Sequence, residues 1–221
     1  MIIAIPAETL PGEKRVALVP ESVQRLAAKK LQIRLQSGAG TNACFSDDDY
    51  RRAGANVETS VVALFDQADL IVKIRPPATA EVERFRRGAA LICLLYPCLH
   101  AAAVGALAAR GVTAIALENM PRATAAQAMD VLSSQSAVAG YRAAIVAAAA
   151  LAKFVPMLMT PAGTIAPARF LVVGAGVAGL QAIATARRLG AVVEAFDVRR
   201  AARSEVESLG AKFIEPWLEE T

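Results

Sequence analysis

The sequence predicts an α/β fold built from two parallel-sheet domains, the second of which is cut short. Short apolar runs bounded by glycine and proline alternate with amphipathic segments of helical length, a pattern typical of strands joined by crossover helices. Of the 221 residues, 55% are hydrophobic, so the chain can fill the cores that such sheets require. This composition also excludes an intrinsically disordered chain.

The first part of the chain contains enough strands for a domain of its own. One helix is predicted to begin at Pro20 and another after Ser46, whose side chain precedes three aspartates suited to a helix N-terminus. The glycine-rich segment 37–40 lacks a following Gly-Lys-Ser/Thr sequence and is interpreted as a plain turn. The predicted strands are 1–5, 31–36, 69–75, 89–96 and 112–117. They predict an N-terminal α/β domain over residues 1–132.

A long alanine-rich helix, predicted over 134–154, opens the second domain, which we place at 133–221. The segment after this helix, 155–168, contains three prolines and a glycine and is expected to be a loop. The remaining expected strands are 169–173, 191–196 and 212–215, with helices between them that end before Gly190 and at Gly210.

The strand at 169–173 leads into Gly174, Gly176 and Gly179, which have the GxGxxG spacing. In a dinucleotide-binding turn, the first glycine allows the tight turn, the second leaves room for pyrophosphate, and the third lets the helix lie close to its strand. The helix, beginning at Val177, then offers unpaired N–H groups to the phosphates. Glycine clusters also mark ordinary turns, so the spacing alone does not establish a binding site.

Asp197 supports the binding interpretation because it follows the next strand, about 20 residues after the glycines. A carboxylate there can accept hydrogen bonds from the adenosine ribose and would repel a 2′-phosphate, which favours NAD(H) over NADP(H). Arg199, Arg200 and Arg203 weaken this preference, because arginines can accept a 2′-phosphate. They are equally typical of a solvated helix start, and Asp197 would otherwise be a solvated loop acid.

The predicted second domain has the elements of one mononucleotide half of a Rossmann-like domain. A complete domain has two halves, with the dinucleotide lying across the crevice between them. The expected fold is therefore two Rossmann-like parallel-sheet domains, the second truncated after its first mononucleotide half. The pyrophosphate turn and the ribose acid would be present, and most of the nicotinamide pocket would be missing.

Charge and cysteine content argue against several classes of protein. The net charge is +4, but the basic residues are scattered and few aromatics accompany them, so nucleic-acid binding is not expected. The spacing of Cys93 and Cys98 permits a zinc pair, yet the apolar run around Cys93 is typical of a buried strand, and no metal is expected. No signal-peptide pattern or uninterrupted apolar span of about 20 residues is found, which favours a cytoplasmic, reducing compartment.

Several segments resemble one known family. The matching residues are 3–8, Glu13, 15–17, Pro20, 37–40, 120–136, 174–182 and 196–199. They resemble the alanine dehydrogenase and proton-translocating transhydrogenase superfamily over essentially the whole chain. Within it, the segment 120–136 is similar to the Arg/Gln/Asp loop of the transhydrogenase component that binds NAD(H).

The resemblance implies roles for particular residues. Arg122, Gln127 and Asp130 would be the catalytic group at the nicotinamide end of NADH, together with Ser133. Arg122 and Asp130 would form an ion pair that shapes the loop, and Gln127 would donate to the second nucleotide. The implied residues for the rest of the dinucleotide are Gly174, Gly176, Val177, Gly179, Asp197 and Val198. In the alternative interpretation, the segment from Arg122 to Ser133 only caps the long helix.

Alanine dehydrogenase is the competing member of the superfamily. It uses an arginine, a lysine and a histidine to hold and process a small keto or amino acid; Arg15 and Lys73 stand at positions resembling the first two. Tyr96 stands where the histidine is expected, and a tyrosine, with a pKa of about 10, is a poor proton shuttle at neutral pH. The only histidine, His100, is expected to be a surface or capping residue. A catalytically silent NAD-binding fragment is the third interpretation.

For the transhydrogenase component, the resemblance implies hydride transfer between NADH on this chain and NADP(H) on a partner component. The transfer is coupled to proton translocation in a membrane-spanning component. It depends on the proximity and alignment of two nicotinamide rings rather than on a general acid or base. The resemblance also implies a homodimer held peripherally at the cytoplasmic face of the membrane by its partners.

Overall fold

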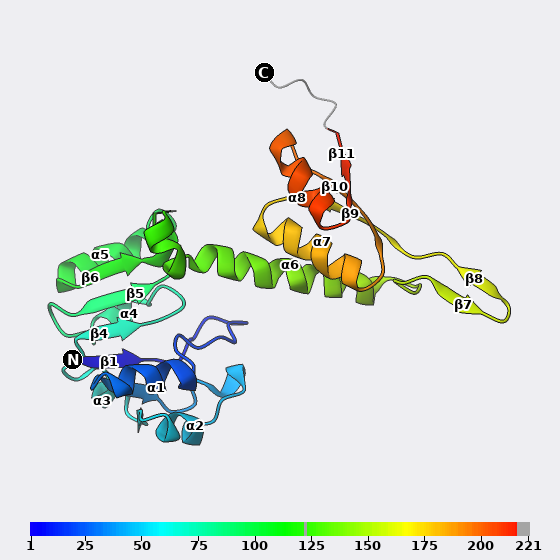
Figure 1. The fold of residues 1–221 in the computed structure, drawn as a ribbon. Coiled ribbons are helices and arrows are strands. Elements are labelled where there is room, and N and C mark those ends of the chain that lie inside the picture. Colours follow the sequence, from blue (N-terminus) through cyan, green and yellow to red (C-terminus); the bar gives the residue numbers. More distant parts are fainter. Residues whose placement is uncertain (122, 216–221) are drawn as a thin grey trace. The chain divides into compact units, whose positions relative to one another are not determined.

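The computed structural model describes residues 1–121 and 123–215. Contacts divide the chain into two compact units, Met1–Met129 and Asp130–Thr221, called here the N-terminal and C-terminal units. Figure 1 traces the elements of both.

The N-terminal unit is a parallel sheet with short helices in its connections. Its strands are β1 (Ile2–Ile5), β2 (Gln32–Gln36), β3 (Asn56–Glu58), β4 (Leu70–Val72), β5 (Ala90–Cys93) and β6 (Thr113–Ala116). Its α-helices are α1 (Pro20–Ala28), α2 (Asp47–Arg52), α3 (Val61–Phe65), α4 (Thr79–Val82) and α5 (Ala101–Arg110). The 3-10 helices are η1 (Thr41–Ala43), η2 (Leu117–Asn119) and η3 (Thr124–Met129). The short strand β3 was not predicted from the sequence.

Strand order in this sheet is β3-β2-β1-β4-β5-β6, which is the doubly wound order with its reversal point between β1 and β4. Both faces of β1 are buried. Ile3 and Ile5 pack with Ile33 on one face, whereas Ala4 belongs to the cluster around Ile71 on the other. This two-sided burial is what an apolar strand in the middle of a parallel sheet requires.

The start of α2 shows the capping that the sequence indicated. The Ser46 hydroxyl accepts from the Asp49 N–H, and the Asp49 carboxylate accepts from the Ser46 N–H at 2.8 Å. This reciprocal pair is a capping box. Residues 37–40 form a turn, as expected.

The C-terminal unit begins with a long helix and continues into a second parallel sheet. Its strands are β7 (Leu158–Thr160), β8 (Gly163–Ile165), β9 (Arg169–Val173), β10 (Val192–Phe196) and β11 (Lys212–Ile214). Its helices are α6 (Val131–Ala150), α7 (Val177–Arg188), η4 (Arg200–Ala202) and α8 (Arg203–Ser208). The sheet order β11-β10-β9, all parallel, is that of the first mononucleotide half of a doubly wound fold. The predicted α/β class with two parallel sheets is thus confirmed.

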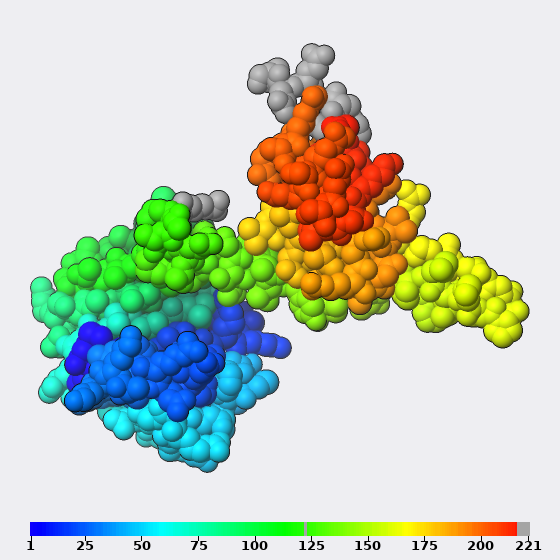
Figure 2. Space-filling model, in the orientation of Figure 1, coloured from blue at the N-terminus to red at the C-terminus, as the bar shows by residue number. Residues whose placement is uncertain are grey.

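The segment 155–168, expected to be a loop, contains a β-hairpin instead. Strands β7 and β8 pair antiparallel, with Thr160 opposite Gly163 across the turn. Figure 2 shows this hairpin, in yellow, standing clear of the rest of its unit. Its side chains Met157, Met159 and Ile165 are exposed. The loop prediction was wrong because Pro161 and Gly163 mark the hairpin turn rather than an irregular segment.

Candidate functional site

The turn between β9 and α7 has the backbone conformation that its glycines were expected to provide. Gly174 has a φ of 94°, in the region that favours glycine, and its N–H donates to the Phe196 carbonyl on β10 at 2.7 Å. A Cβ on Gly179 would lie 1.8 Å from the carbonyl oxygen of Gly174, so only glycine lets α7 pass this close to the turn. The turn itself therefore requires the first and third glycines.

Gly176 is different, because nothing in the turn requires it to lack a side chain. Its backbone is extended, and a Cβ built there would meet no atom within 4 Å. Gly176 is the N-cap of α7, and no side chain caps the first helical turn, which begins at Val177. The missing Cβ leaves open space in front of a helix N-terminus, where backbone N–H groups and the helix dipole favour an anion such as a pyrophosphate.

A hollow of about 560 Å³ lies beside this turn and is lined by residues of α6 and α7. Gly140 of α6 allows the two helices to approach, because a Cβ there would lie 2.0 Å from the Ala178 carbonyl oxygen. The sequence did not indicate this role for Gly140. A contact between two helices distant in sequence leaves no local spacing pattern.

Asp197, at the end of β10, is held beside the glycine turn. Its carboxylate accepts from the backbone N–H groups of Ala175 at 2.7 Å and Arg199 at 2.8 Å, and from the Arg199 guanidinium at 3.2 and 3.3 Å. These hydrogen bonds, chiefly that of the Arg199 side chain, lower the pKa of Asp197 to about 2. The structure thus brings an ionised acid, only 7% exposed, next to the open helix N-terminus. The neighbouring Val198 is exposed.

The residues expected at the nicotinamide end belong to both units. Gln127 lies on η3 of the N-terminal unit with its side chain exposed. Asp130 is the N-cap of α6, and its carboxylate accepts from the Ser133 N–H at 2.9 Å and from the Ser133 hydroxyl at 2.6 Å. This cap makes α6 begin three residues earlier than predicted. Arg122 and its expected ion pair with Asp130 lie outside the described residues.

The N-terminal unit contains a hollow of about 360 Å³, lined by residues that follow β1 and β4. In doubly wound folds, the crevice beyond the carboxyl ends of these strands is the usual ligand position. Lys73 is buried in its wall, with Nζ 3.0 Å from Glu81 and 3.9 Å from Glu8. Tyr96 and His100 also line this hollow.

Two arginines next to this hollow share one buried carboxylate. Glu13 lies 2.6 Å from Arg15 and 2.8 Å from Arg75, and these contacts, that of Arg15 first, lower the pKa of Glu13 to about 2. Arg15, Arg75 and Lys73 are thus each paired with a carboxylate. The sequence pointed to Arg15 and Lys73 but did not indicate their pairing. Nor did it indicate that Arg75 and Lys73, which follow β4, reach Glu13 and Glu8 in the loop after β1.

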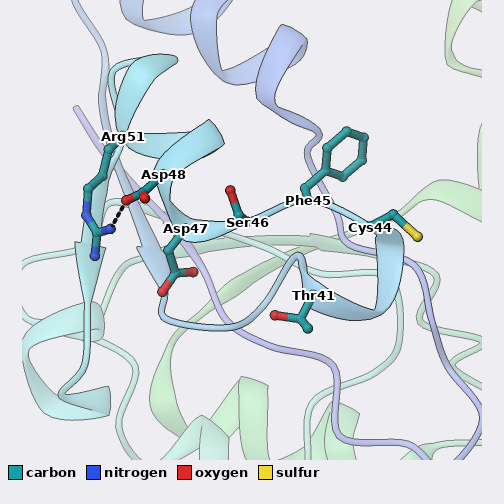
Figure 3. Close-up of a pocket in the computed structure, with 7 residues that line it drawn as sticks. All are labelled: Thr41, Cys44, Phe45, Ser46, Asp47, Asp48 and Arg51. Carbon is teal, nitrogen blue, oxygen red and sulfur yellow. Dashed lines mark hydrogen bonds and ion pairs between the residues drawn. The ribbon is translucent and has the colours of Figure 1, made fainter.

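The hollow beside α2, of about 500 Å³, is built from helix-capping groups (Figure 3). Asp47 accepts from the Ser37 hydroxyl at 2.6 Å and from the Gly38 N–H at 2.9 Å. Asp48 pairs with Arg51 at 2.5 Å. These carboxylates stabilise a turn and a short helix, so this hollow is not a candidate for dinucleotide binding.

Comparison with known proteins covers both units. Residues 4–139 match the sequence model for the N-terminal domain of the alanine dehydrogenase/PNT family, and residues 143–220 match its C-terminal domain. An NAD(P) transhydrogenase alpha-subunit protein of Rhodospirillum rubrum is 50% identical over 219 residues, which are 97% of this chain and 57% of the relative. The alanine dehydrogenase of Mycolicibacterium smegmatis is 34% identical over 201 residues, which are 90% of this chain and 54% of that protein.

A solved transhydrogenase structure is also similar to this chain over nearly its whole length. The crystal structure of transhydrogenase from Sinorhizobium meliloti superimposes with a TM-score of 0.93 at 49% identity, covering 97% of this chain and 64% of that one. The chain spans little more than half the length of the curated relatives it matches.

Proposed function

Because the two family matches together cover most of its length, this chain belongs to the alanine dehydrogenase/PNT family, and we propose that it is the NAD(H)-binding part of an NAD(P) transhydrogenase. Hydride then passes between NADH held by this chain and NADP⁺ held by a partner component, coupled to proton translocation. The observation that carries the proposal is the 2.7 Å hydrogen bond from the Ala175 N–H to Asp197. It joins the ionised ribose acid to the turn that faces the pyrophosphate.

Three observations support transhydrogenase over alanine dehydrogenase. Identity to the Rhodospirillum transhydrogenase subunit is 50%, against 34% to the Mycolicibacterium alanine dehydrogenase. Tyr96, which by resemblance stands where alanine dehydrogenase has its histidine, lines the N-terminal hollow. The cations Arg15, Lys73 and Arg75 are paired with carboxylates, which weakens their attraction for the carboxylate of a keto acid.

In the proposed site, the dinucleotide supplies the hydride, and this chain binds and orients it. Gly176 and Val177 receive the pyrophosphate at the α7 N-terminus, with Gly174 and Gly179 shaping the turn. Asp197 accepts from the adenosine ribose, and Val198 lies beside it. The nicotinamide end is assigned to Arg122, Gln127, Asp130 and Ser133.

The contact between Asp130 and Ser133 supports the assignment of these residues to the nicotinamide end. Asp130 accepts the Ser133 hydroxyl hydrogen at 2.6 Å, which leaves the hydroxyl oxygen as an acceptor for the nicotinamide amide. Gln127 is exposed and is assigned to the second nucleotide. No residue has to move a proton, because hydride transfer between two nicotinamide rings needs alignment.

The proposed partners are an NADP(H)-binding component, a membrane-spanning component and a second copy of this chain. Among the described residues, no helix is long and apolar enough to cross a membrane. Exposed apolar side chains on the β7–β8 hairpin, including Met157 and Met159, are suited to a subunit contact. The protein would therefore lie at the cytoplasmic membrane face through its partners. Neither nucleic acid nor a metal ion has a part in this function.

The proposal is tested by following a deuterium label from C4 of NADH into NADPH by mass spectrometry. We expect transfer only when the chain is combined with an NADP⁺-loaded partner component from a related transhydrogenase. Gln127→Ala should slow the transfer about tenfold or more while leaving NADH affinity nearly unchanged, because its assigned contact is with the second nucleotide.

NADH oxidation that requires pyruvate and ammonium would instead show alanine dehydrogenase. A chain that binds NADH but transfers no label, while a longer relative does, would be a silent binding fragment.

A further inference from the structure

The contact between Arg199 and Asp197 concerns the choice between NAD(H) and NADP(H). Asp197 is held on one side by the backbone N–H groups of Ala175 and Arg199, at 2.7 and 2.8 Å. The Arg199 side chain adds two longer contacts, at 3.2 Å from Nε and 3.3 Å from Nη2. Since the backbone donors remain when the side chain is changed, we expect the carboxylate to keep its position without the guanidinium.

The guanidinium changes the charge that a ligand meets. Asp197 is almost fully buried, whereas 62% of the Arg199 side chain is exposed. An unscreened carboxylate at this position repels a 2′-phosphate, and a guanidinium accommodates one. Here the two groups are paired, so the carboxylate is screened, while most of the Arg199 side chain stays exposed to solvent.

We propose that the Arg199 side chain determines how strongly this site discriminates against a 2′-phosphate, by screening Asp197 and donating to the phosphate. The site thus prefers the unphosphorylated ribose through Asp197 and retains measurable affinity for the phosphorylated one through Arg199. This inference rests on the proposed dinucleotide site and assigns its specificity to a pair of residues rather than to the acid alone.

The test compares binding of ADP-ribose and 2′-phospho-ADP-ribose to the 221-residue chain by calorimetry. Both probes avoid the nicotinamide end. In Arg199→Met, we expect affinity for the phosphorylated probe to fall about tenfold and affinity for ADP-ribose to change less than about twofold, because one positive charge near a phosphate is removed. Arg199→Lys keeps the charge and should lose less than about threefold.

The control is Arg188→Met, which removes the same charge from the exposed last turn of α7, at the other end of the helix from the glycine turn. It should leave the ratio of the two affinities unchanged. Arg199→Met should raise the preference for ADP-ribose over 2′-phospho-ADP-ribose. This increase should be smaller at about 0.5 M than at about 0.05 M salt, because salt already screens the attraction between the guanidinium and the phosphate.

The outcomes separate the inference from the function on which it rests. Binding of neither probe by the unchanged protein would overturn the dinucleotide site and the inference together. Binding of ADP-ribose with no detectable binding of the phosphorylated probe would overturn the inference alone. An equal change for both probes in Arg199→Met, or the same selectivity gain in Arg188→Met, would also reject it. Circular dichroism of each variant shows that the fold is retained.

Discussion

Asp197 has two roles that a choice of ligand can separate. It accepts the Ala175 N–H and so stabilises the glycine turn, and in the proposed site it also accepts from the adenosine ribose. Removing the carboxylate would affect both roles. A ligand that lacks the ribose 2′-hydroxyl reports only on the first, because the second contact is absent from the start.

For Asp197→Ala, we expect NADH affinity to fall about tenfold, as for the loss of a hydrogen bond to a charged group. Affinity for 2′-deoxy-NADH, deoxygenated in the adenosine ribose, should fall much less. Fluorescence titration of both ligands against both proteins measures the difference. If the variant weakens the two ligands equally, Asp197 acts only through the turn.

At this scale, the sequence indicated residues whose roles depend on local spacing. Gly174, Gly179 and Asp197 lie where the GxGxxG spacing and the following strand predicted, because one strand, turn and helix determine their positions. Glu81 could not be linked to Lys73 in this way. Their pairing depends on how the segment after β4 folds back to bring α4 against Lys73.

Among the elements, α6 and α7 pack through small residues. A Cβ on Gly140 would meet the Ala178 carbonyl oxygen at 2.0 Å, and backbone cannot yield as a flexible side chain can. The α6–α7 contact therefore depends on glycine at this position. In contrast, a Cβ at Gly105, inside α5, would meet nothing within 4 Å.

These two glycines predict opposite effects of the same substitution. Gly140→Ala should destabilise the C-terminal unit by about 1–3 kcal/mol, because the helices must separate. Gly105→Ala should stabilise α5 by about 0.5–1 kcal/mol, because alanine is the better helix former and has room. Urea unfolding combined with amide hydrogen exchange in α5 and α6 distinguishes the two. A stabilising Gly140→Ala would contradict the close helix contact.

Elements with a clear apolar pattern were predicted, whereas the short strands β3, β7 and β8 were not. The predicted strands at 31–36 and 191–196 correspond to β2 and β10, because runs of this length show their apolar pattern clearly. The strands of the β7–β8 hairpin have three residues each and exposed apolar side chains, so no buried face distinguishes them from a loop.

At the scale of the whole molecule, the charge network around Glu13 contributes to stability in acid. Glu13 has a pKa of about 2 in the folded chain against an ordinary value of 4.5, because Arg15 and Arg75 bind it. A carboxyl group whose pKa is lower in the folded than in the unfolded chain stabilises the fold at pH values above its unfolded pKa. That contribution is lost as the pH falls from 4.5 through 2.

Glu13→Gln should therefore lower the free energy of unfolding at pH 7 by about 1–2 kcal/mol. The difference from the unchanged protein should narrow as the pH falls below 4.5. Urea unfolding at a series of pH values measures both. Glu21→Gln, which breaks an exposed pair with Arg25 on α1, is the control and should cost less than about 0.5 kcal/mol. A difference that stays constant down to pH 2 would contradict the role of Glu13.

The sequence by itself determined the α/β class, the alternation of strands and helices, the glycine turn after β9 and the acid that follows β10. Each depends on the order and spacing of neighbouring residues, which a local pattern records. Only the tertiary structure decided that the Arg199 guanidinium contacts Asp197 and that the lack of a side chain at Gly140 allows α6 to pack closely against α7. It also decided that Glu13 and Glu81 pair with the cations of the N-terminal hollow. These features depend on distances between side chains and helices that come together only when the chain folds.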